Sequence, residues 1–254
     1  AGRYPNGTAS PSSSQDSIRK WTMKQIAVRS CLLAAGIVIM AAGIVIVTKT
    51  SLGTSPISSL GYVLSLSFPN MSYGAFMFAW NIALLLGQIA VLRRDFKAIA
   101  LLQIPISVVF SLGIDAFNNL FALYEPSSYP ESLVLLAIGV VVLAFGVACT
   151  VVANVAMNSG EALVCAVAGK AGWNFGRTKV GFDLVCVSLA VAASLVLLGG
   201  IEGVREGTLV AAFATGLVAN AFIDLMGGAR PPLAEPSSGS RKTGKGERAP
   251  EAGA

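Results

Sequence analysis

Two carboxylates within apolar segments are the residues of this sequence best placed to do chemistry. Asp115 lies well inside a predicted span, in the run SLGIDAFNNLF, and Glu161 lies beside Gly160 in NSGEAL. Neither has a basic residue nearby in the sequence. An ionisable side chain inside a bilayer is costly and burial raises the pKa of a carboxyl, so either could be a proton- or cation-coupling group. The alternative for both is a hydrogen-bonded or protonated packing residue.

Other polar residues in apolar runs have a structural explanation beside the functional one. Asp183 follows Lys179 by four residues. This is the spacing of an ion pair on one helix face, so a structural pair explains Asp183 as well as an ion pathway does. Asn81 lies near the middle of another run. Asp224 closes the last run, where solvent can reach it.

The residue types that many enzymes and metal sites need are missing from the sequence. There is no histidine, which is the commonest proton shuttle and the commonest metal ligand. The four cysteines show no C-x-x-C spacing and lie in or near apolar runs, as buried small hydrophobic residues do. No nucleophile has a paired base, and no Walker A or dinucleotide-binding motif occurs. We therefore expect no enzymatic activity, no metal and no cofactor.

The composition is typical of a polytopic membrane protein. Of the 254 residues, 54% are hydrophobic and 12% are charged, and the mean hydropathy is +0.72. About 20 apolar residues are needed for each span, so the length allows roughly six spans and little soluble mass. The net charge of +5 lies mostly in the flanks and short loops. This favours the anionic face of a lipid bilayer, rather than nucleic acid, as the partner.

Long apolar runs are the predicted transmembrane helices of an all-α membrane domain at residues 26–226. They cover residues 25–47, 73–92, 98–123, 132–152, 180–200 and 208–226. Residues 1–25 and 227–254 are rich in Ser, Gly and Pro and carry basic residues. This composition predicts two disordered tails, both on the cytoplasmic side.

Two further intervals, 51–68 and 154–169, are apolar but interrupted by Gly, Pro and polar residues. The distribution of positive charge indicates whether these intervals cross the membrane, because cytoplasmic loops carry an excess of Lys and Arg. If only the six long runs span and the N-terminus is cytoplasmic, the basic loop RRDFK and both tails lie in the cytoplasm. Counting the first interval as a span would move RRDFK outside. Both intervals are therefore predicted to be re-entrant or broken segments, with the first break at Gly53 to Ser59.

The chain contains an internal repeat. LLAAGIVIMAAG at 32–43 and LLAIGVVVLAFG at 135–146 match at seven of twelve positions, at an offset of 103 residues. The same offset places Ser55 on Asn158, and an offset of 102 pairs Asn81 with Asp183. Repeat one covers about 26–123 and repeat two about 132–226, and since each holds three spans, the second copy must be inverted. Paired breaks in inverted repeats indicate a transporter architecture with its site where the copies meet.

A substrate or ion pathway between the two breaks is the resulting site hypothesis. Thr54 and Ser55 are predicted to face Asn158 and Glu161 across a pseudo-symmetric cavity. The candidate residues are Thr54, Ser55, Asn81, Asp115, Asn158, Glu161 and Asp183.

Several stretches resemble the bacterial YczE/YyaS/YitT family of integral membrane proteins. They are SLGTSPISSLGYVLS, the RRDFK loop followed by ALLQIP, KVGFD, and GGIEGVREGT. The last of these contains a predicted interfacial turn, IEGVREGT, whose charges pair locally. The resemblance runs from about Arg29 to Met226 and implies a multi-pass protein of the bacterial inner membrane. It implies no particular substrate and no catalytic or binding residues.

Two functions of different classes fit these observations. The first is a gradient-driven or facilitative transporter of an unknown small solute or ion, which the inverted repeat, the paired breaks and the buried carboxylates support. The second is a non-transporting scaffold, regulatory or accessory membrane protein, which the long polar tails support. In both cases we expect cytoplasmic termini, and a homo-oligomer is compatible with the sequence.

Overall fold

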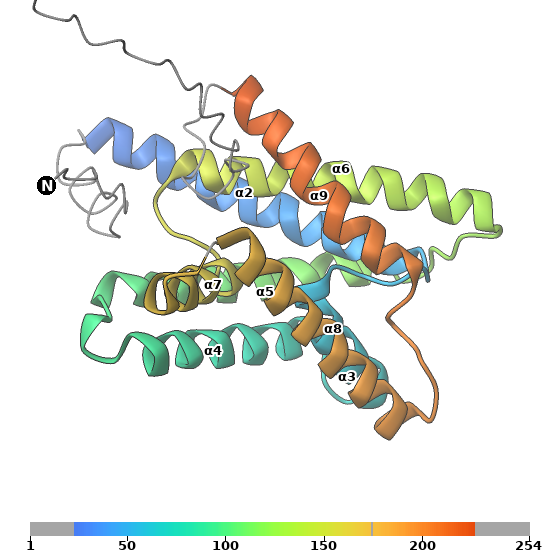
Figure 1. Ribbon diagram of the computed structural model, residues 1–254. Coiled ribbons are helices and arrows are strands. Elements are labelled where there is room, and N and C mark those ends of the chain that lie inside the picture. Colours follow the sequence, from blue (N-terminus) through green and yellow to red (C-terminus); the bar gives the residue numbers. More distant parts are fainter. Residues whose placement is uncertain (1–22, 174, 227–254) are drawn as a thin grey trace, which may run out of the picture.

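The structure is helical throughout the part of the chain that it describes. A computed structural model describes residues 23–173 and 175–226. Its helices are α2 (Met23–Lys49), α3 (Pro56–Ser67), α4 (Tyr73–Leu92), η1 (Arg93–Asp95), η2 (Ala98–Leu102), α5 (Gln103–Leu120), α6 (Tyr129–Ala153), α7 (Ser159–Ala171), α8 (Phe175–Leu198) and α9 (Glu206–Leu225) (Figure 1). The predicted tails lie outside the described residues, except that residues 23–25 already belong to α2.

Six of these helices are long and apolar enough to cross a bilayer, which confirms the predicted polytopic helical fold. They contain α2, α4, α5, α6, α8 and α9. The predicted run 73–92 coincides with α4. The run 98–123 corresponds to the candidate span Ala98–Leu120, which begins with the 3-10 helix η2, and only its predicted end was too late, because α5 ends at Leu120.

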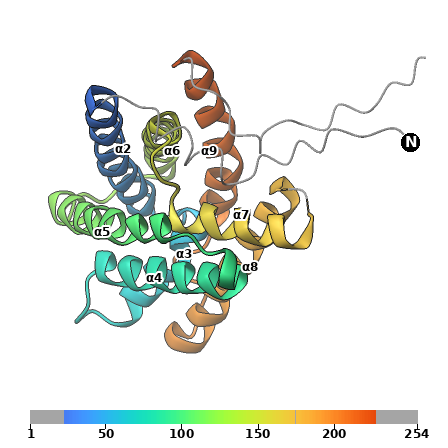
Figure 2. The same ribbon diagram turned by 90° about the vertical axis from the view of Figure 1, so that its left-hand side faces the viewer.

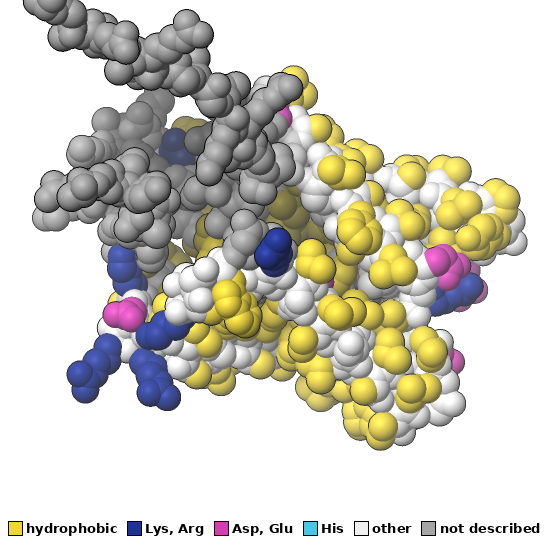
Figure 3. All heavy atoms as spheres, in the orientation of Figure 1, with side chains coloured by type: hydrophobic (Ala, Val, Ile, Leu, Met, Phe, Trp, Pro, Cys, Tyr) yellow, Lys and Arg dark blue, Asp and Glu magenta, His cyan; other side chains and the backbone are white. Residues whose placement is uncertain are grey.

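The ends of the long helices gather at two ends of the molecule (Figure 1). At one end, named here the Lys49 end, α2 and α5 finish and α4 and α9 begin. At the other, named the Arg93 end, α4 and α6 finish and α2 begins. Exposed basic residues gather at the Arg93 end, whereas acidic residues predominate at the Lys49 end (Figure 3).

Helix α2 ends at Lys49 because the residues that follow leave the helical conformation. Ser51 has φ +57° and Gly53 has φ +117°, and a positive φ is most easily adopted by glycine. Ser55 is extended and Pro56 takes the first helical position, where its missing N–H costs nothing, so that α3 begins there. The break therefore covers residues 50–55. The second half of the predicted break was wrong, because it already belongs to α3.

The second break follows α6 and is made by asparagines. Asn154 ends α6 in the left-handed conformation, with φ +49°. Asn158 is the N-cap of α7, and its Oδ1 accepts a hydrogen bond of 2.9 Å from the backbone N–H of Ser159. Helix α7 ends at Gly172, where φ is +66°. The second break therefore covers residues 154–158.

Helices α3 and α7 are too short to cross a bilayer. They have 12 and 13 residues, which corresponds to about 18–20 Å against a hydrocarbon core of about 30 Å. The first lies at the Lys49 end of the molecule and the second at the Arg93 end (Figure 1). Their length and position support the prediction that both segments enter the membrane and return to the side that they left.

The core of the molecule is the contact between α2 and α6, which lie side by side (Figure 2). The glycines of the repeated motif permit it: a Cβ added to Gly43 would lie 2.5 Å from the backbone nitrogen of Leu143, and one added to Gly146 would lie 2.6 Å from that of Met40. Small residues thus let the two backbones approach closely.

The short helices pack across the two halves of the chain. Helix α3 packs against α8, and its counterpart α7 packs against α4. Similarly, α5 packs on α2 while α9 packs on α6. This reciprocal pattern is what a two-fold relation between the halves would produce, so it supports the inverted repeat, which stays a prediction.

Candidate functional site

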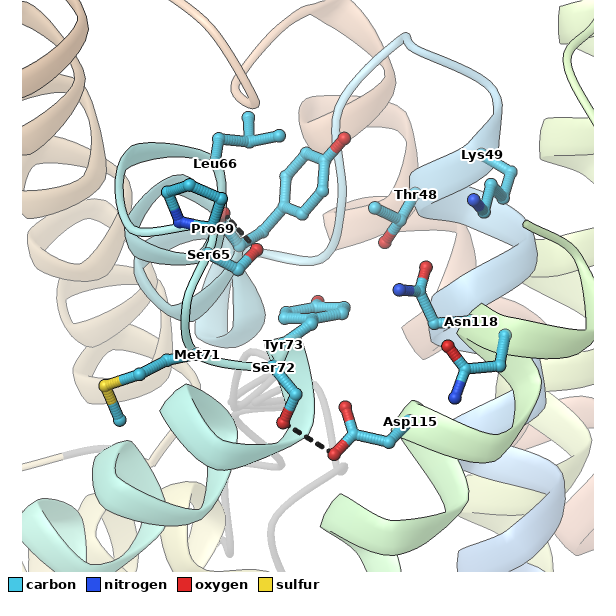
Figure 4. Close-up of a pocket in the computed structure, with 12 residues that line it drawn as sticks. Thr48, Lys49, Ser65, Leu66, Pro69, Met71, Ser72, Tyr73, Asp115 and Asn118 are labelled. Carbon is cyan, nitrogen blue, oxygen red and sulfur yellow. Dashed lines mark hydrogen bonds between the residues drawn. The ribbon is translucent and has the colours of Figure 1, made fainter. Parts of the chain in front are cut away.

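A cavity of about 490 Å³ lies at the Lys49 end, between the ends of α2, α3, α4 and α5 (Figure 4). Charged, hydroxyl, amide, aromatic and aliphatic side chains all contribute to it. The lining residues are Thr48, Lys49, Tyr62, Ser65, Leu66, Pro69, Met71, Ser72, Tyr73, Asp115, Asn118 and Asn119.

Asp115 is the acidic residue of this cavity, and its carboxylate is fixed at the N-terminus of α4. One oxygen, Oδ2, accepts a hydrogen bond of 2.7 Å from the hydroxyl of Ser72, and Oδ1 accepts one of 2.7 Å from the backbone N–H of Gly74. Ser72 is the N-cap of α4 and also accepts a hydrogen bond from the N–H of Ala75 at 3.1 Å. The carboxylate thus satisfies a free N–H of the helix and interacts favourably with the helix dipole.

The depth expected for Asp115 was wrong. We expected it well inside the third span, but α5 ends only five residues after it, at Leu120. The asparagines at 118 and 119 and the turn that follows finish the helix there. Of the two interpretations given for Asp115, the hydrogen-bonded residue therefore fits its contacts. The residue also lines a cavity.

Gly74 allows the carboxylate to reach the backbone of α4. A Cβ at this position would lie 2.2 Å from the backbone oxygen of Ser111 and 2.6 Å from Cγ of Asp115. No other residue type fits at so close an approach of α4 to α5 without displacing one of them.

A cluster of buried hydroxyls adjoins the cavity at the first break. The hydroxyl cluster comprises Thr48, Thr54, Ser55, Ser58 and Tyr73. The Thr48 hydroxyl donates to that of Thr54 over 3.1 Å, Thr54 and Ser58 share a hydrogen bond of 3.0 Å, and Ser58 and Ser55 share one of 2.9 Å. Thr48 and Tyr73 belong to both the cluster and the cavity lining, so they connect the two.

The hydroxyl of Tyr73 is the unsatisfied member of the hydroxyl cluster. The residue is only 4% exposed, and its hydroxyl lies close to those of Thr48, Thr54 and Ser58 but makes no hydrogen bond of standard geometry with a described residue. A buried polar group without a partner is unusual and needs an explanation, and a bound solute or water molecule could satisfy this hydroxyl.

The first turn of α9, together with Arg205 just before it, holds the first break in place. The backbone N–H of Gly207 donates to the carbonyl of Leu52 at 2.8 Å, and the N–H of Thr54 donates to the hydroxyl of Thr208 at 3.2 Å. Arg205 donates to the carbonyl of Ser51 at 3.3 Å. These contacts join residues about 154 positions apart. The predicted local pairing of charges in this turn is confirmed by a 3.3 Å ion pair between Arg205 and Glu206.

A charged group adjoins the second break. Asp183 forms an ion pair with Lys179, four residues earlier on α8, which confirms the predicted pairing. Glu161, in the first turn of α7, lies within electrostatic reach of both. We name these three residues the Glu161 triad. Two candidate carboxylates, Glu161 and Asp183, are 22 residues apart in the sequence and lie within electrostatic reach of each other.

The helices that follow the two breaks meet through an apolar contact. A Cβ added to Gly160 would lie 2.9 Å from Cδ1 of Ile57, so the N-terminal turns of α3 and α7 touch there. Of the four residues predicted to face one another across a cavity, Thr54 and Ser55 lie in the hydroxyl cluster, whereas Asn158 caps α7 and Glu161 lies in the first turn of α7. None of these four lines the cavity described above.

Asn81 is buried in the middle of α4, with 1% of its surface exposed. Its amide nitrogen donates to the carbonyl of Met77 at 3.0 Å, and its Oδ1 has no partner among the described residues. Asp183, its predicted repeat counterpart, pairs with Lys179.

Most residues of the cavity were not among the sequence candidates. The missed residues include Lys49 and the two tyrosines, Tyr62 and Tyr73, whose rings form an edge-to-face pair with centroids 5.5 Å apart. Among these missed residues, only Lys49 could have been singled out from the sequence, because it is a basic residue at the end of an apolar run. Within the described ranges, no three His, Cys, Asp or Glu side chains lie together as a metal site would require.

Comparisons with known proteins agree with the membrane fold. Residues 27–224 match the model of a family described as "Family of unknown function (DUF6198)". The chain is 31% identical over 202 residues to the protein of Bacillus subtilis (strain 168) described as "Uncharacterized membrane protein YczE", covering 77% of this chain and 86% of that protein. No solved structure matches the chain.

Proposed function

The chain belongs to the DUF6198 family and is similar to a bacterial membrane protein, and from this premise we propose that it transports a small solute. Transport is either facilitative, down the gradient of the solute itself, or driven by the gradient of an ion. The observation that carries the proposal is the cavity at the Lys49 end, which continues into the hydroxyl cluster at a break in the helical framework. Such a break offers hydroxyl and backbone groups to a solute, which a continuous helix cannot do.

The Glu161 triad is the proposed coupling element. Its two carboxylates and one ammonium group carry a net charge of −1 when all are ionised, so it can accept a proton or a monovalent cation. An ionisable cluster beside a helix break is the type of group that a transporter uses to respond to an ion gradient. The triad lies at the second break, on the opposite half of the molecule from the cavity (Figure 1).

The distribution of charge supports an orientation. Exposed Arg93 and Arg94 and the half-buried Lys97 lie at the Arg93 end together with Lys170 and Arg177. By the positive-inside rule, this end faces the cytoplasm. The cavity then opens toward the outside, and the N-terminus, which precedes α2 at the Arg93 end, is cytoplasmic in a bacterial inner membrane.

The proposal is tested by filling the cavity and measuring flux. Ser65 lines the cavity, and its hydroxyl donates to the carbonyl of Tyr62 in its own helix. Ser65→Trp should reduce uptake at least about tenfold in proteoliposomes tested with labelled amino acids, sugars, nucleosides and inorganic ions, because the indole occupies the solute's space. Val196→Trp is the matched control, since Val196 is 82% exposed on α8, far from this cavity in the sequence and absent from its lining.

Two outcomes would count against transport. Equal uptake by Ser65→Trp and Val196→Trp would show that the cavity is not on the path. If the reconstituted, folded protein moved none of the solutes in the panel, the non-transporting scaffold or accessory function would be favoured instead.

A further inference from the structure

Two opposite charges line the cavity without pairing with each other. Lys49 is the last residue of α2 and Asp115 lies on α5, and both are half-buried. Neither forms an ion pair with a described residue, so their charged atoms are more than 4.0 Å apart. Figure 4 shows the two side chains separated along one side of the cavity, with Asn118 between them.

Partial burial makes this arrangement informative. A charge that is removed from water without a partner is destabilising, and a ligand that pairs with it recovers the loss. The two oxygens of Asp115 each accept one hydrogen bond, from Ser72 and Gly74, and a carboxylate oxygen has a second lone pair. The carboxylate is therefore held in one orientation and can still accept hydrogen bonds from a cationic group.

The rest of the cavity is amphipathic. Tyr62 and Tyr73 present an edge-to-face aromatic pair, and Leu66, Pro69 and Met71 add aliphatic surface. The volume of about 490 Å³ lies within the range of small-molecule sites, which combine apolar walls with a few well-placed polar groups.

We propose that this cavity binds a small zwitterion, an amino acid with an apolar side chain, whose ammonium group pairs with Asp115 and whose carboxylate pairs with Lys49. The proposal rests on the proposed function, of which it names the substrate class. A simple amine would leave Lys49 without a partner and a simple carboxylate would leave Asp115 without an ammonium, so each single-charge ligand forgoes one interaction. The aromatic and aliphatic residues then contact the apolar side chain of the ligand.

Calorimetry on the purified protein tests the assignment with three matched probes. L-Leucine carries both charges, isoamylamine has the same carbon skeleton without the carboxylate, and isocaproate has it without the ammonium group. We expect leucine to bind at least about tenfold more tightly than either analogue, because each analogue loses a charge-assisted interaction.

Variants assign each charge to its residue. Lys49→Met should remove the preference for leucine over isoamylamine, and Lys49→Arg should retain it. Asp115→Asn keeps an oxygen that can accept from Gly74 but should remove the preference for leucine over isocaproate. Because each readout is a ratio between two ligands on one protein, a general loss of folded material does not imitate it.

The outcomes separate this assignment from transport itself. Leucine binding with the expected charge dependence, but without flux, would support the assignment and overturn transport. Flux of another solute, with no discrimination between leucine and its analogues, would overturn the assignment and leave transport standing. Unchanged leucine binding in Lys49→Met would also overturn the assignment, since Lys49 would then serve only the membrane surface.

Discussion

The two breaks in the helical framework differ in the kind of polar group that they place in the protein. The first, residues 50–55, adjoins a cluster of neutral hydroxyls and is held by the first turn of α9 and by Arg205, whose guanidinium group donates to the carbonyl of Ser51. The second, residues 154–158, is capped by Asn158 and adjoins the charges of the Glu161 triad. Related positions in the two halves of the chain thus carry different chemistry.

This difference indicates a division of labour. At the first break, hydroxyls and backbone groups adjoin a cavity in which the charges of Lys49 and Asp115 are proposed to pair with a solute. A cluster of carboxylates and an ammonium group changes its net charge when a proton or cation binds, so it can respond to a gradient. We infer that the first break serves solute binding and the second serves coupling. The predictions below compare one break with the other.

The largest difference is expected when a methyl group is added to a glycine of positive φ, at Gly53 in the first break or at Gly172 after α7. The quantity compared is the loss in the free energy of unfolding. Gly53→Ala should lower the free energy of unfolding by roughly 2–5 kcal/mol, the sum of backbone strain and overpacking. At this position φ is +117°, and the new Cβ would lie 2.3 Å from the hydroxyl oxygen of Thr208. Unfolding in mixed detergent micelles measures the effect.

Gly172→Ala is the matched control at the end of α7. Its φ is +66°, but nothing lies within 4 Å of the added Cβ, so only backbone strain remains, about 1 kcal/mol. Equal losses in the two variants would show that the first turn of α9 moves aside readily and does not hold the first break.

The second prediction concerns coupling. Glu161→Gln should reduce gradient-driven uptake at least about tenfold, equivalent to about 1.4 kcal/mol, because the amide cannot take up a proton. Leucine binding at the cavity should be unchanged, since Glu161 does not line it. Uptake by proteoliposomes with and without a pH gradient, combined with calorimetry, makes the measurement.

Asp115→Asn provides the reciprocal experiment. It should alter ligand discrimination at the cavity and leave the relative response to a pH gradient intact. If Glu161→Gln retained the full response to the gradient, coupling would have to be assigned elsewhere.

Much of the fold follows from the sequence because lipid requires long apolar runs. A run such as 73–92 must be helical and continuous to satisfy its backbone in the membrane, so its boundaries can be read directly. The breaks were also recognisable, since Gly53, Pro56 and Asn158 have conformational preferences that end or begin helices. Their limits shifted by a few residues because Ser55 and Pro56 start a helix rather than interrupt one.

The site was harder to predict because its residues come from the ends of four separate helices. Depth along a span cannot be read from composition, so Asp115 was placed too far inside. Tyr62 and Tyr73 look like ordinary membrane residues until the structure brings their rings together. The contacts of Thr208 with the first break depend on packing between segments about 154 positions apart, for which the local sequence holds no signal.

The smallest expected effects concern the arginines at the two breaks. Arg205 donates to the carbonyl of Ser51 at 3.3 Å and its side chain is 51% exposed. Arg29 is more buried and donates to the carbonyls of Ala153 at 3.0 Å and Val152 at 3.3 Å, just before the second break. Arg205→Met should lower the free energy of unfolding by about 0.5 kcal/mol and Arg29→Met by about 1 kcal/mol, since solvent weakens the exposed contact.

Amide hydrogen exchange shows where in the protein each of these small effects occurs. Arg205→Met should speed exchange of the Leu52 and Thr54 amides only slightly, because the Gly207 and Thr208 contacts still hold the first break. Arg29→Met should speed exchange at the end of α6, whose last carbonyls lose their donor. A larger loss of protection at the first break than at the second would mean that Arg205, rather than the backbone contacts of α9, fixes the segment beside the cavity.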